Sequence, residues 1–228
     1  MARSEGFQFR QFYLRHDRCA MKVGTDGVLL GAWTPVSPAP DRILDVGTGC
    51  GLIARMLMQR CPAAQTEGID IDLAAVEQAQ ENGVRAYHSR LQDWNPDYRY
   101  CLIVSNPPYF QNSLKNPDAG RQLARHTDSL SYEELLQHSA RLLNAHGALA
   151  LILPAEAEEE VRALAEQYSL YCTRMTRVHG RENKPAKRIL LLFSQNKTNA
   201  PETDTLVLES PDGSRSPQYS ALTKDFYL

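Results

Sequence analysis

The sequence has few of the features that mark secreted, membrane or metal-binding proteins. Only five of its 228 residues are cysteines, and none form a CxxC pair, which argues against a disulfide framework or a zinc site and favours a reducing compartment. The longest apolar runs are far shorter than a membrane span, and residues 1–5 lack the apolar core of a signal peptide. The net charge is only -2, so a nucleic-acid contact would need a local basic patch. We therefore expect a soluble cytoplasmic protein without a metal ion; its oligomeric state stays open, with a monomer as the simpler expectation.

What the sequence does have is an alternation of apolar strands and amphipathic helices from residue 42 onward. Seven strands are predicted, over residues 43–46, 66–72, 84–88, 101–105, 148–153, 170–178 and 189–193. Helices are predicted over residues 52–59, 73–82, 131–144 and 156–168, the third of them with a capping box at its start. A short strand at 205–209 and a last helix from about residue 220 follow. The order indicates an α/β fold with a mostly parallel, doubly wound sheet and right-handed crossovers.

A glycine turn, Asp45-Val46-Gly47-Thr48-Gly49-Cys50-Gly51, joins the first of these strands to its helix. Leu52 stands where a dinucleotide fingerprint needs glycine, and no Gly-Lys-Ser/Thr follows, so neither a pyrophosphate site nor a P-loop is predicted. Glycines at such a turn let a ligand lie against the backbone. Asp45 could hold an amine of that ligand.

Acidic residues also follow the next two strands. Asp70 is placed to accept from a pair of sugar hydroxyls, with Asp72 as a neighbouring candidate, and Asp93 could accept from an adenine amino group. Each carboxylate alone could be a solvated loop acid. Their order along the chain favours a nucleoside-type ligand.

A rigid stretch, Asn106-Pro107-Pro108-Tyr109, ends the fourth strand. Two prolines cannot continue a strand ladder, because each lacks an N–H and has a fixed φ. They leave an amide, a proline carbonyl and an aromatic ring at the carboxyl end of the strand, where open α/β sheets bind ligands. A stiff turn with a surface tyrosine is the alternative. The polar stretch 111–127 reads as a long functional loop.

From residue 43 to 193 this pattern resembles the class I S-adenosylmethionine-dependent methyltransferases, which have a Rossmann-like seven-stranded sheet with an antiparallel last strand. The resemblance implies S-adenosylmethionine as cofactor, bound by Gly47, Gly49, Gly51, Asp70 and Asp93, with Asp45 beside them. It also suggests a division of the chain. Residues 1–40 would form a cap on the substrate side, 41–196 the catalytic domain, and 197–228 an extension packed on that domain.

The Asn-Pro-Pro-Tyr stretch matches the motif of the amino-methyltransferases within that class. An exocyclic NH₂ is a poor nucleophile, because its lone pair is delocalised into the ring. Asn106 and Pro107 can accept its two hydrogens and draw the nitrogen toward tetrahedral geometry, while Tyr109, with Pro108 beside it, can stack on the base. Positioning then carries the transfer without a strong base, once a polynucleotide base has left its stack.

The flanking segments, residues 11–33 and 219–228, look like those of the bacterial tRNA1(Val) (adenine-37 N6)-methyltransferases. This resemblance implies N6-methylation of an adenine in tRNA, with cofactor or substrate contacts from Lys22, Gly24, Thr25 and Asp26. Several basic residues are candidate tRNA contacts, although a solvated charged surface would explain them equally: His16, Arg18, and the cluster of Arg174, Arg177, Arg181, Lys184, Lys187 and Arg188. Two alternatives remain open, a glutamine N5-methyltransferase acting on a protein and a non-catalytic RNA-binding module.

Overall fold

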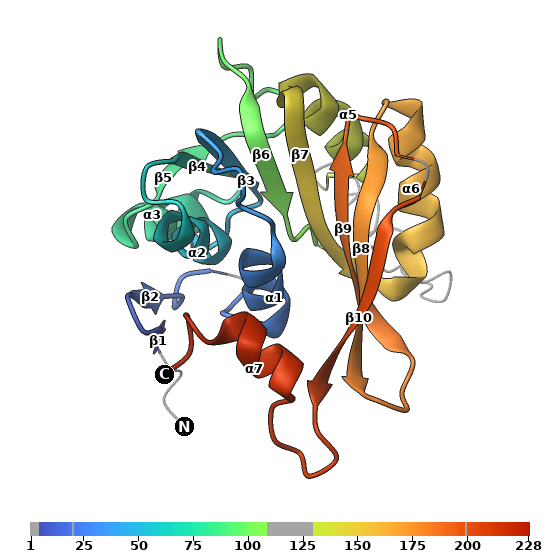
Figure 1. Ribbon diagram of the computed structural model, residues 1–228. Helices are drawn as coiled ribbons and strands as arrows, with labels where there is room; N and C mark the ends of the chain where they lie inside the picture. The colour runs from blue at the N-terminus through green and yellow to red at the C-terminus, as the bar shows by residue number, and fades with distance from the viewer. Residues whose placement is uncertain (1–4, 20, 109–129, 199) are drawn as a thin grey trace, which may run out of the picture.

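The computed structural model describes residues 5–19, 21–108, 130–198 and 200–228, and their central element is an eight-stranded sheet (Figure 1). Its strand order is β10-β8-β9-β7-β6-β3-β4-β5. In chain order the strands are β3 (Arg42–Val46), β4 (Gln65–Asp70), β5 (Arg85–His88), β6 (Tyr100–Ser105), β7 (Leu143–Pro154), β8 (Tyr171–Arg181), β9 (Ala186–Ser194) and β10 (Glu202–Glu209).

The seven strands predicted from the sequence are all present, and the last of them, β9, runs antiparallel to both β7 and β8, as expected. The other pairings in the sheet are parallel. The eighth strand, β10, pairs in parallel with β8 and widens the sheet by one strand. The sequence predicted that strand but not its place in the sheet.

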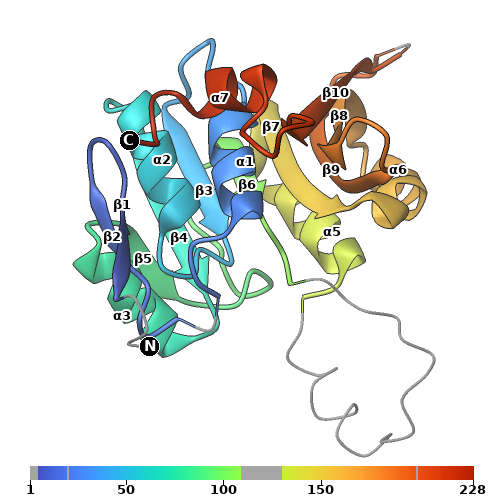
Figure 2. The same cartoon turned by 90° about the horizontal axis from the view of Figure 1, so that it is seen from below.

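Helices cover both faces of the sheet, which Figure 2 shows from below. The helices are α1 (Thr25–Trp33), α2 (Leu52–Arg60), α3 (Leu73–Glu81), α5 (Tyr132–Leu142), α6 (Glu158–Gln167, after the 3₁₀ turn Ala155–Ala157) and α7 (Pro217–Thr223). Apolar residues of α1, α2 and α7 pack on one face, and those of α5 and α6 pack on the other. This is the three-layer arrangement that an α/β sequence pattern predicts.

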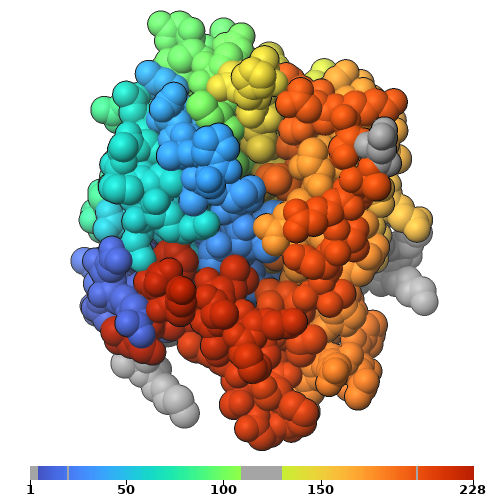
Figure 3. Space-filling view, viewed as in Figure 1, coloured from blue at the N-terminus to red at the C-terminus, as the bar shows by residue number. Residues whose placement is uncertain are grey.

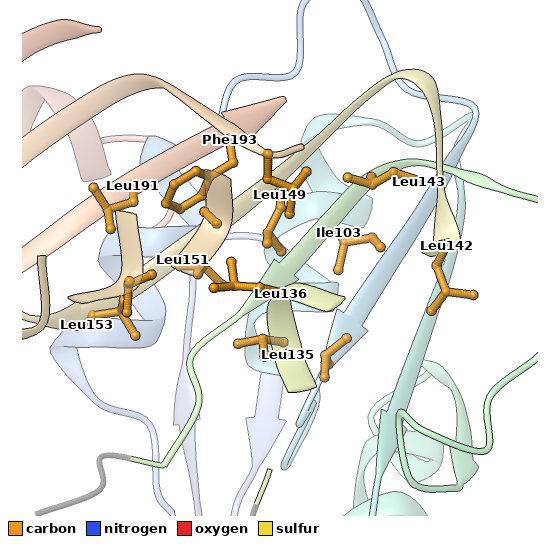
Figure 4. Packing of buried hydrophobic residues seen from close by; sticks show 14 of the residues in the cluster. Ile103, Leu135, Leu136, Leu142, Leu143, Leu149, Leu151, Leu153, Leu191 and Phe193 are labelled. Atoms are coloured by element: carbon orange, nitrogen blue, oxygen red, sulfur yellow. The ribbon is translucent and has the colours of Figure 1, made fainter. Parts of the chain in front are cut away.

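The larger apolar core lies between the sheet and the α5–α6 layer (Figure 4). Leu135 and Leu136 of α5 point at side chains of β6, β7 and β9 there, among them the fully buried Phe193. The predicted capping box begins α5: the Ser131 Oγ accepts from the Glu134 N–H at 3.1 Å, and the Glu134 carboxylate accepts from the Ser131 N–H at 2.9 Å. This core fixes the strands whose carboxyl ends carry the site.

No helix lies between β5 and β6, where residues 89–99 form a turn and a loop. Aromatic side chains fill that place around a buried carboxylate. Glu67 accepts hydrogen bonds from the Tyr98 and Tyr100 hydroxyls, both at 2.8 Å, and the Trp94 indole donates to Tyr100 at 2.9 Å. The network anchors the loop that leads into β6.

The described N-terminal segment, from residue 5 onward, packs against the C-terminal residues beside α1 and α2 (Figures 1 and 3). An N-terminal hairpin, β1 (Gly6–Gln8) and β2 (Tyr13–Arg15), lies next to the C-terminal residues, and the Arg10 N–H donates to the Phe226 carbonyl at 2.8 Å. The division at residues 40 and 197 stays a prediction. None of the helices in the described ranges is long and apolar enough to cross a membrane.

Candidate active site

A cavity of about 610 Å³ opens at the carboxyl ends of β3, β4 and β6, beside the N-terminus of α1. Its size is that of a small-molecule site. It brings together residues that are far apart in the sequence, and those predicted for the site are Lys22, Gly24, Thr25, Asp26, Gly47, Gly49, Asp70, Asp72, Asn106, Pro107 and Pro108. The glycine turn and the Asn-Pro-Pro stretch therefore border one space.

The glycine turn adopts backbone conformations that favour glycine. Gly47 and Gly49 have φ values of 70° and 55°, and a Cβ built on either would meet no atom within 4 Å, so these two residues leave open space beside the backbone. Gly51, with φ 83°, is different: it does not line the cavity, and a Cβ there would lie 2.8 Å from the Val84 side chain. Two glycines keep the cavity floor open, whereas the third permits close packing.

Asp70 ends β4 and holds the glycine turn in place. Its carboxylate accepts from the Gly49 N–H at 2.8 Å and from the Asp72 N–H at 2.9 Å. Asp72 is the N-cap of α3 and accepts from the Ala74 N–H at 2.9 Å. Both line the cavity and both accept local backbone hydrogen bonds, so Asp70 as the ribose partner stays a prediction from its place at the end of β4.

Asp45 lies beneath the turn, fully buried, rather than in the cavity lining. One carboxylate oxygen accepts from the Thr48 hydroxyl at 2.8 Å and from the Ala54 N–H at 3.2 Å, while the other has no hydrogen-bond partner among the described residues. Burial raises the pKa of Asp45 to about 7, against the lowering effect of those two bonds. Asp45 thus stabilises the turn from below.

The Asn-Pro-Pro stretch continues directly from β6. The Ser105 hydroxyl donates to the Val46 carbonyl at 2.8 Å, which ties the end of β6 to the end of β3 and its glycine turn. Asn106 is half-buried, Pro107 buried and Pro108 exposed, and all three line the cavity. Tyr109 and the predicted loop 111–127 lie outside the described residues, so the stacking role of Tyr109 stays a prediction.

Several cavity residues were not predicted. Ser89, Leu91 and Gln92 line it after β5, whereas Asp93 is exposed and does not. The turn at residues 91–93 places Gln92, rather than Asp93, in the cavity lining. The place of these residues after a strand could not predict which of them would face the cavity. Arg188, at the start of β9, also lines the cavity and pairs with Asp26, its Nε lying 2.9 Å from Oδ2.

Two predicted RNA contacts lie away from the cavity. His16 is buried, and its Nδ1 accepts from the Val23 N–H at 3.3 Å. Arg18 is partly exposed and forms ion pairs with Glu77 and Glu81 of α3. Packing and ion pairing explain both residues, and a contact with RNA stays a prediction.

The basic residues between β8 and β9 lie at the same end of the sheet as the cavity. β9 is antiparallel to both β8 and β7, and β7 is parallel to β6, so β8 runs in the same direction as β6. The hairpin turn 181–186, which follows the carboxyl end of β8, therefore lies at the end of the sheet where β6 ends. Arg181 is ion-paired with Glu209 at 2.9 Å, and Lys184 and Lys187 are exposed. Arg174 and Arg177 come earlier in β8, farther from this end of the sheet, and pair with Asp204 and Glu158. Of the basic residues in β8, β9 and the turn between them, only Arg188 lines the cavity itself.

Solved structures with the same fold include proteins described as methyltransferases. A protein from Agrobacterium tumefaciens described as a predicted O-methyltransferase superposes with a TM-score of 0.66 at 17% identity, covering 88% of this chain and 96% of that one. A ribosomal protein L11 methylase from Lactobacillus delbrueckii superposes with a TM-score of 0.54 at 18% identity, covering 75% and 78%. At such identities the likeness concerns the fold alone: the chain has the Rossmann-like fold of the class I methyltransferases.

Sequence comparison gives a narrower match. Residues 28–174 match the family described as Methyltransferase small domain. Proteins named tRNA1(Val) (adenine(37)-N6)-methyltransferase are 47% identical in Parabacteroides distasonis, 44% in Flavobacterium psychrophilum and 43% in Aeromonas hydrophila. The matches cover 97% to 100% of this chain and 97% to 99% of those proteins. The glycine turn and the Asn-Pro-Pro stretch line one cavity, as these similarities lead one to expect. This chain belongs to the methyltransferase small domain family, and its similar relatives over nearly the full length include proteins named tRNA1(Val) (adenine(37)-N6)-methyltransferase.

Proposed function

We propose that this protein transfers a methyl group from S-adenosylmethionine to the exocyclic N6 of adenine 37 in tRNA1(Val), giving N6-methyladenosine. The observation that carries the proposal is the shared cavity: Asn106 and Pro107 border the same space as Gly47, Gly49 and Asp70. Near-full-length identity to relatives with that printed name supports the choice of substrate. We also propose that the enzyme works in the cytoplasm, in keeping with its five free cysteines.

The residues around the glycine turn fit S-adenosylmethionine. The open space beside Gly47 and Gly49 allows a ligand to lie against the backbone. The carboxylate of Asp70 lines that space, and although each of its oxygens accepts one backbone N–H, each can accept a further bond from a ribose hydroxyl. Lys22 and Thr25 border the cavity from the opposite side and are candidate contacts for the methionine part. When bound, the cofactor supplies an electrophilic sulfonium methyl group.

The chain's own contribution to the reaction is to bind and orient the target amine. The side-chain oxygen of Asn106 and the carbonyl of Pro107 accept the two amine hydrogens, which draws the nitrogen toward tetrahedral geometry and takes its lone pair out of conjugation with the ring. After the methyl transfer, one of these hydrogens leaves as a proton to solvent. Fixed acceptors of this kind stabilise the positive charge that develops on the nitrogen. The two prolines and the Ser105–Val46 bond hold the acceptors rigidly, so little reorganisation accompanies the transfer.

The target base has to leave its stack to reach Asn106, since an enzyme cannot enclose the amine of a base that is still stacked. Tyr109 is the proposed stacking partner for the displaced base. The exposed Lys184 and Lys187, together with Arg181, are proposed to bind the tRNA backbone beside the cavity.

Asn106→Ala tests the proposed acceptor. We expect the methylation rate to fall by roughly 100-fold or more, as when a single preorganised polar group is removed from other active sites. The dissociation constant for S-adenosylmethionine should stay within about twofold, because Asn106 is assigned to the amine. Asn196→Ala, an exposed asparagine beyond β9, is the control and should methylate normally. An unchanged rate in Asn106→Ala would exclude the assigned role.

The glutamine N5-methyltransferase alternative remains, because the same two acceptors also suit a planar amide. Parallel assays on total tRNA and on glutamine-containing proteins such as release factors separate the two. Label transferred only to protein would replace the proposed substrate. A protein that binds tRNA but not the cofactor would instead support the non-catalytic alternative.

A further inference from the structure

An ion pair borders the cavity on the side away from Asp70. Asp26 lies in the first turn of α1, and Arg188 is near the start of β9, where it pairs in register with Pro154 at the end of β7. The Arg188 Nε donates to the Asp26 carboxylate at 2.9 Å, and an Nη1 hydrogen goes to the Lys187 carbonyl at 3.0 Å. Their side chains are 31% and 24% exposed, so the pair is open to solvent.

The strand order decides which part of the cavity this pair faces. Reading across the sheet, β4 carries Asp70, β3 the glycine turn, β6 Asn106, then β7, then β9 with Arg188. Asn106 therefore separates the cofactor-binding strands from the strand of Arg188. With neighbouring strands ~4.8 Å apart, β9 lies roughly 10 Å beyond β6. Arg188 is on the side where the nucleotide carrying the target base has to lie.

The chemistry of this side suits a phosphate. A guanidinium is planar, permanently charged and matched to phosphate oxygens, and it keeps its geometry best when one edge is fixed. Asp26 fixes the Nε edge of Arg188. The segment 181–188 contains four cations, counting Arg188, and one carboxylate, Glu182. Arg181 and Arg188 are paired with Glu209 and Asp26, so the exposed Lys184 and Lys187 carry the excess positive charge that a polyanion would meet at this end of the sheet.

We infer that Arg188, oriented by Asp26, binds a backbone phosphate of the tRNA next to the methylated adenine. The inference rests on the proposed function and deepens it, because it assigns a substrate-recognition residue inside the cavity rather than outside it. The rival explanation is mechanical: the pair would only fasten α1 to β9, and Arg188 would never contact RNA.

The test measures tRNA methylation over a range of salt concentrations for wild type, Arg188→Ala, Arg188→Lys and Asp26→Asn. Arg162→Ala is the matched control, since Arg162 has a similar exposed fraction (37%), is also ion-paired, and lies on α6 outside the cavity. For each protein the KM for tRNA, the KM for S-adenosylmethionine, kcat and the Tm are recorded.

For Arg188→Ala we expect the KM for tRNA to rise roughly tenfold, because one charge-assisted contact is lost. The slope of log KM against log salt should decrease by about 0.7 to 0.9, the contribution of one phosphate. The KM for S-adenosylmethionine should not change. Arg188→Lys should keep the wild-type salt slope and raise the KM for tRNA by less than Arg188→Ala does. Asp26→Asn should also raise the KM for tRNA by less than Arg188→Ala does, and Arg162→Ala should match wild type.

An unchanged salt slope in Arg188→Ala, with equal losses of Tm in Arg188→Ala and Asp26→Asn, would establish the mechanical explanation and overturn the inference. A change confined to the KM for S-adenosylmethionine would also overturn it. Failure of the proposed function looks different, since wild type itself would then transfer no methyl group to tRNA.

Discussion

Replacing Asp45 by asparagine should remove a large part of the pH dependence of stability. Asp45 is fully buried, and burial raises its pKa to about 7 from an ordinary value of 3.8. Asparagine has the same shape, and its carbonyl oxygen can still accept from the Thr48 hydroxyl and the Ala54 N–H. Its amide replaces the carboxylate oxygen that has no partner among the described residues. The substitution therefore removes the ionisation and keeps both hydrogen bonds.

The sign and size of the effect follow from proton linkage. Between about pH 4 and pH 7 the folded protein binds a proton at Asp45 that the unfolded chain does not, so the free energy of unfolding falls as the pH rises. One unit of pKa difference between the folded and unfolded states is worth about 1.4 kcal/mol, so the protonation of Asp45 contributes roughly 4 kcal/mol to the free energy of unfolding at low pH. Between pH 5 and pH 8 the wild type should lose about 2.5 kcal/mol that the Asp45→Asn variant keeps.

Thermal unfolding followed by circular dichroism at pH 5, 6, 7 and 8, without cofactor, measures this difference. Asp45→Asn should gain roughly 5–10 °C in Tm relative to wild type from pH 5 to pH 8. Asp93→Asn, which removes an exposed carboxylate, is the control and should follow wild type throughout. If wild type and Asp45→Asn lost stability in parallel with rising pH, the carboxyl would not be held protonated by burial, and this reasoning would be refuted.

Three further substitutions test the fold around the site by urea denaturation. Gly51→Ala should lower the free energy of unfolding by about 2–3 kcal/mol, because a side chain at φ 83° is strained and its Cβ would lie 2.8 Å from the Val84 side chain. The control Gly213→Ala, at φ 84° with no atom of the described residues near the added Cβ, should lower it by only about 1 kcal/mol. Equal losses in the two variants would exclude the packing role of Gly51. Ser131→Ala should cost about 1 kcal/mol by removing the capping box of α5, and no loss would show that the cap is dispensable. Phe193→Ala should cost about 3–5 kcal/mol, and a loss below about 1 kcal/mol would contradict its central place in the core.

The features that the sequence predicted well are those with short-range physical causes. Alternating apolar segments gave the strands and helices. The two prolines after β6 end that strand, and the glycine turn begins α2, with Gly47 and Gly49 in left-handed conformations. The carboxyl ends of parallel strands meet at one edge, so Asp70 and Asn106 could be expected at one site from their places after strands.

The features that were missed depend on contacts between distant parts of the chain. Asp26 and Arg188 are separated by 162 positions, and no local pattern signals their pairing. Arg188 was visible only as one of several basic residues. Asp93 follows a strand but is exposed, and Gln92, its neighbour in the turn at residues 91–93, lines the cavity in its place. Gly51 looked like a ligand-binding glycine, although its close contact is with Val84.

The most direct test of the proposed function is nucleoside mapping of purified tRNA1(Val) after incubation with this protein and labelled S-adenosylmethionine. Digestion and mass spectrometry should show one new N6-methyladenosine, at position 37, with wild-type protein and none with Asn106→Ala. Unmethylated tRNA, or a methyl group on another atom or at another position, would contradict the proposed function.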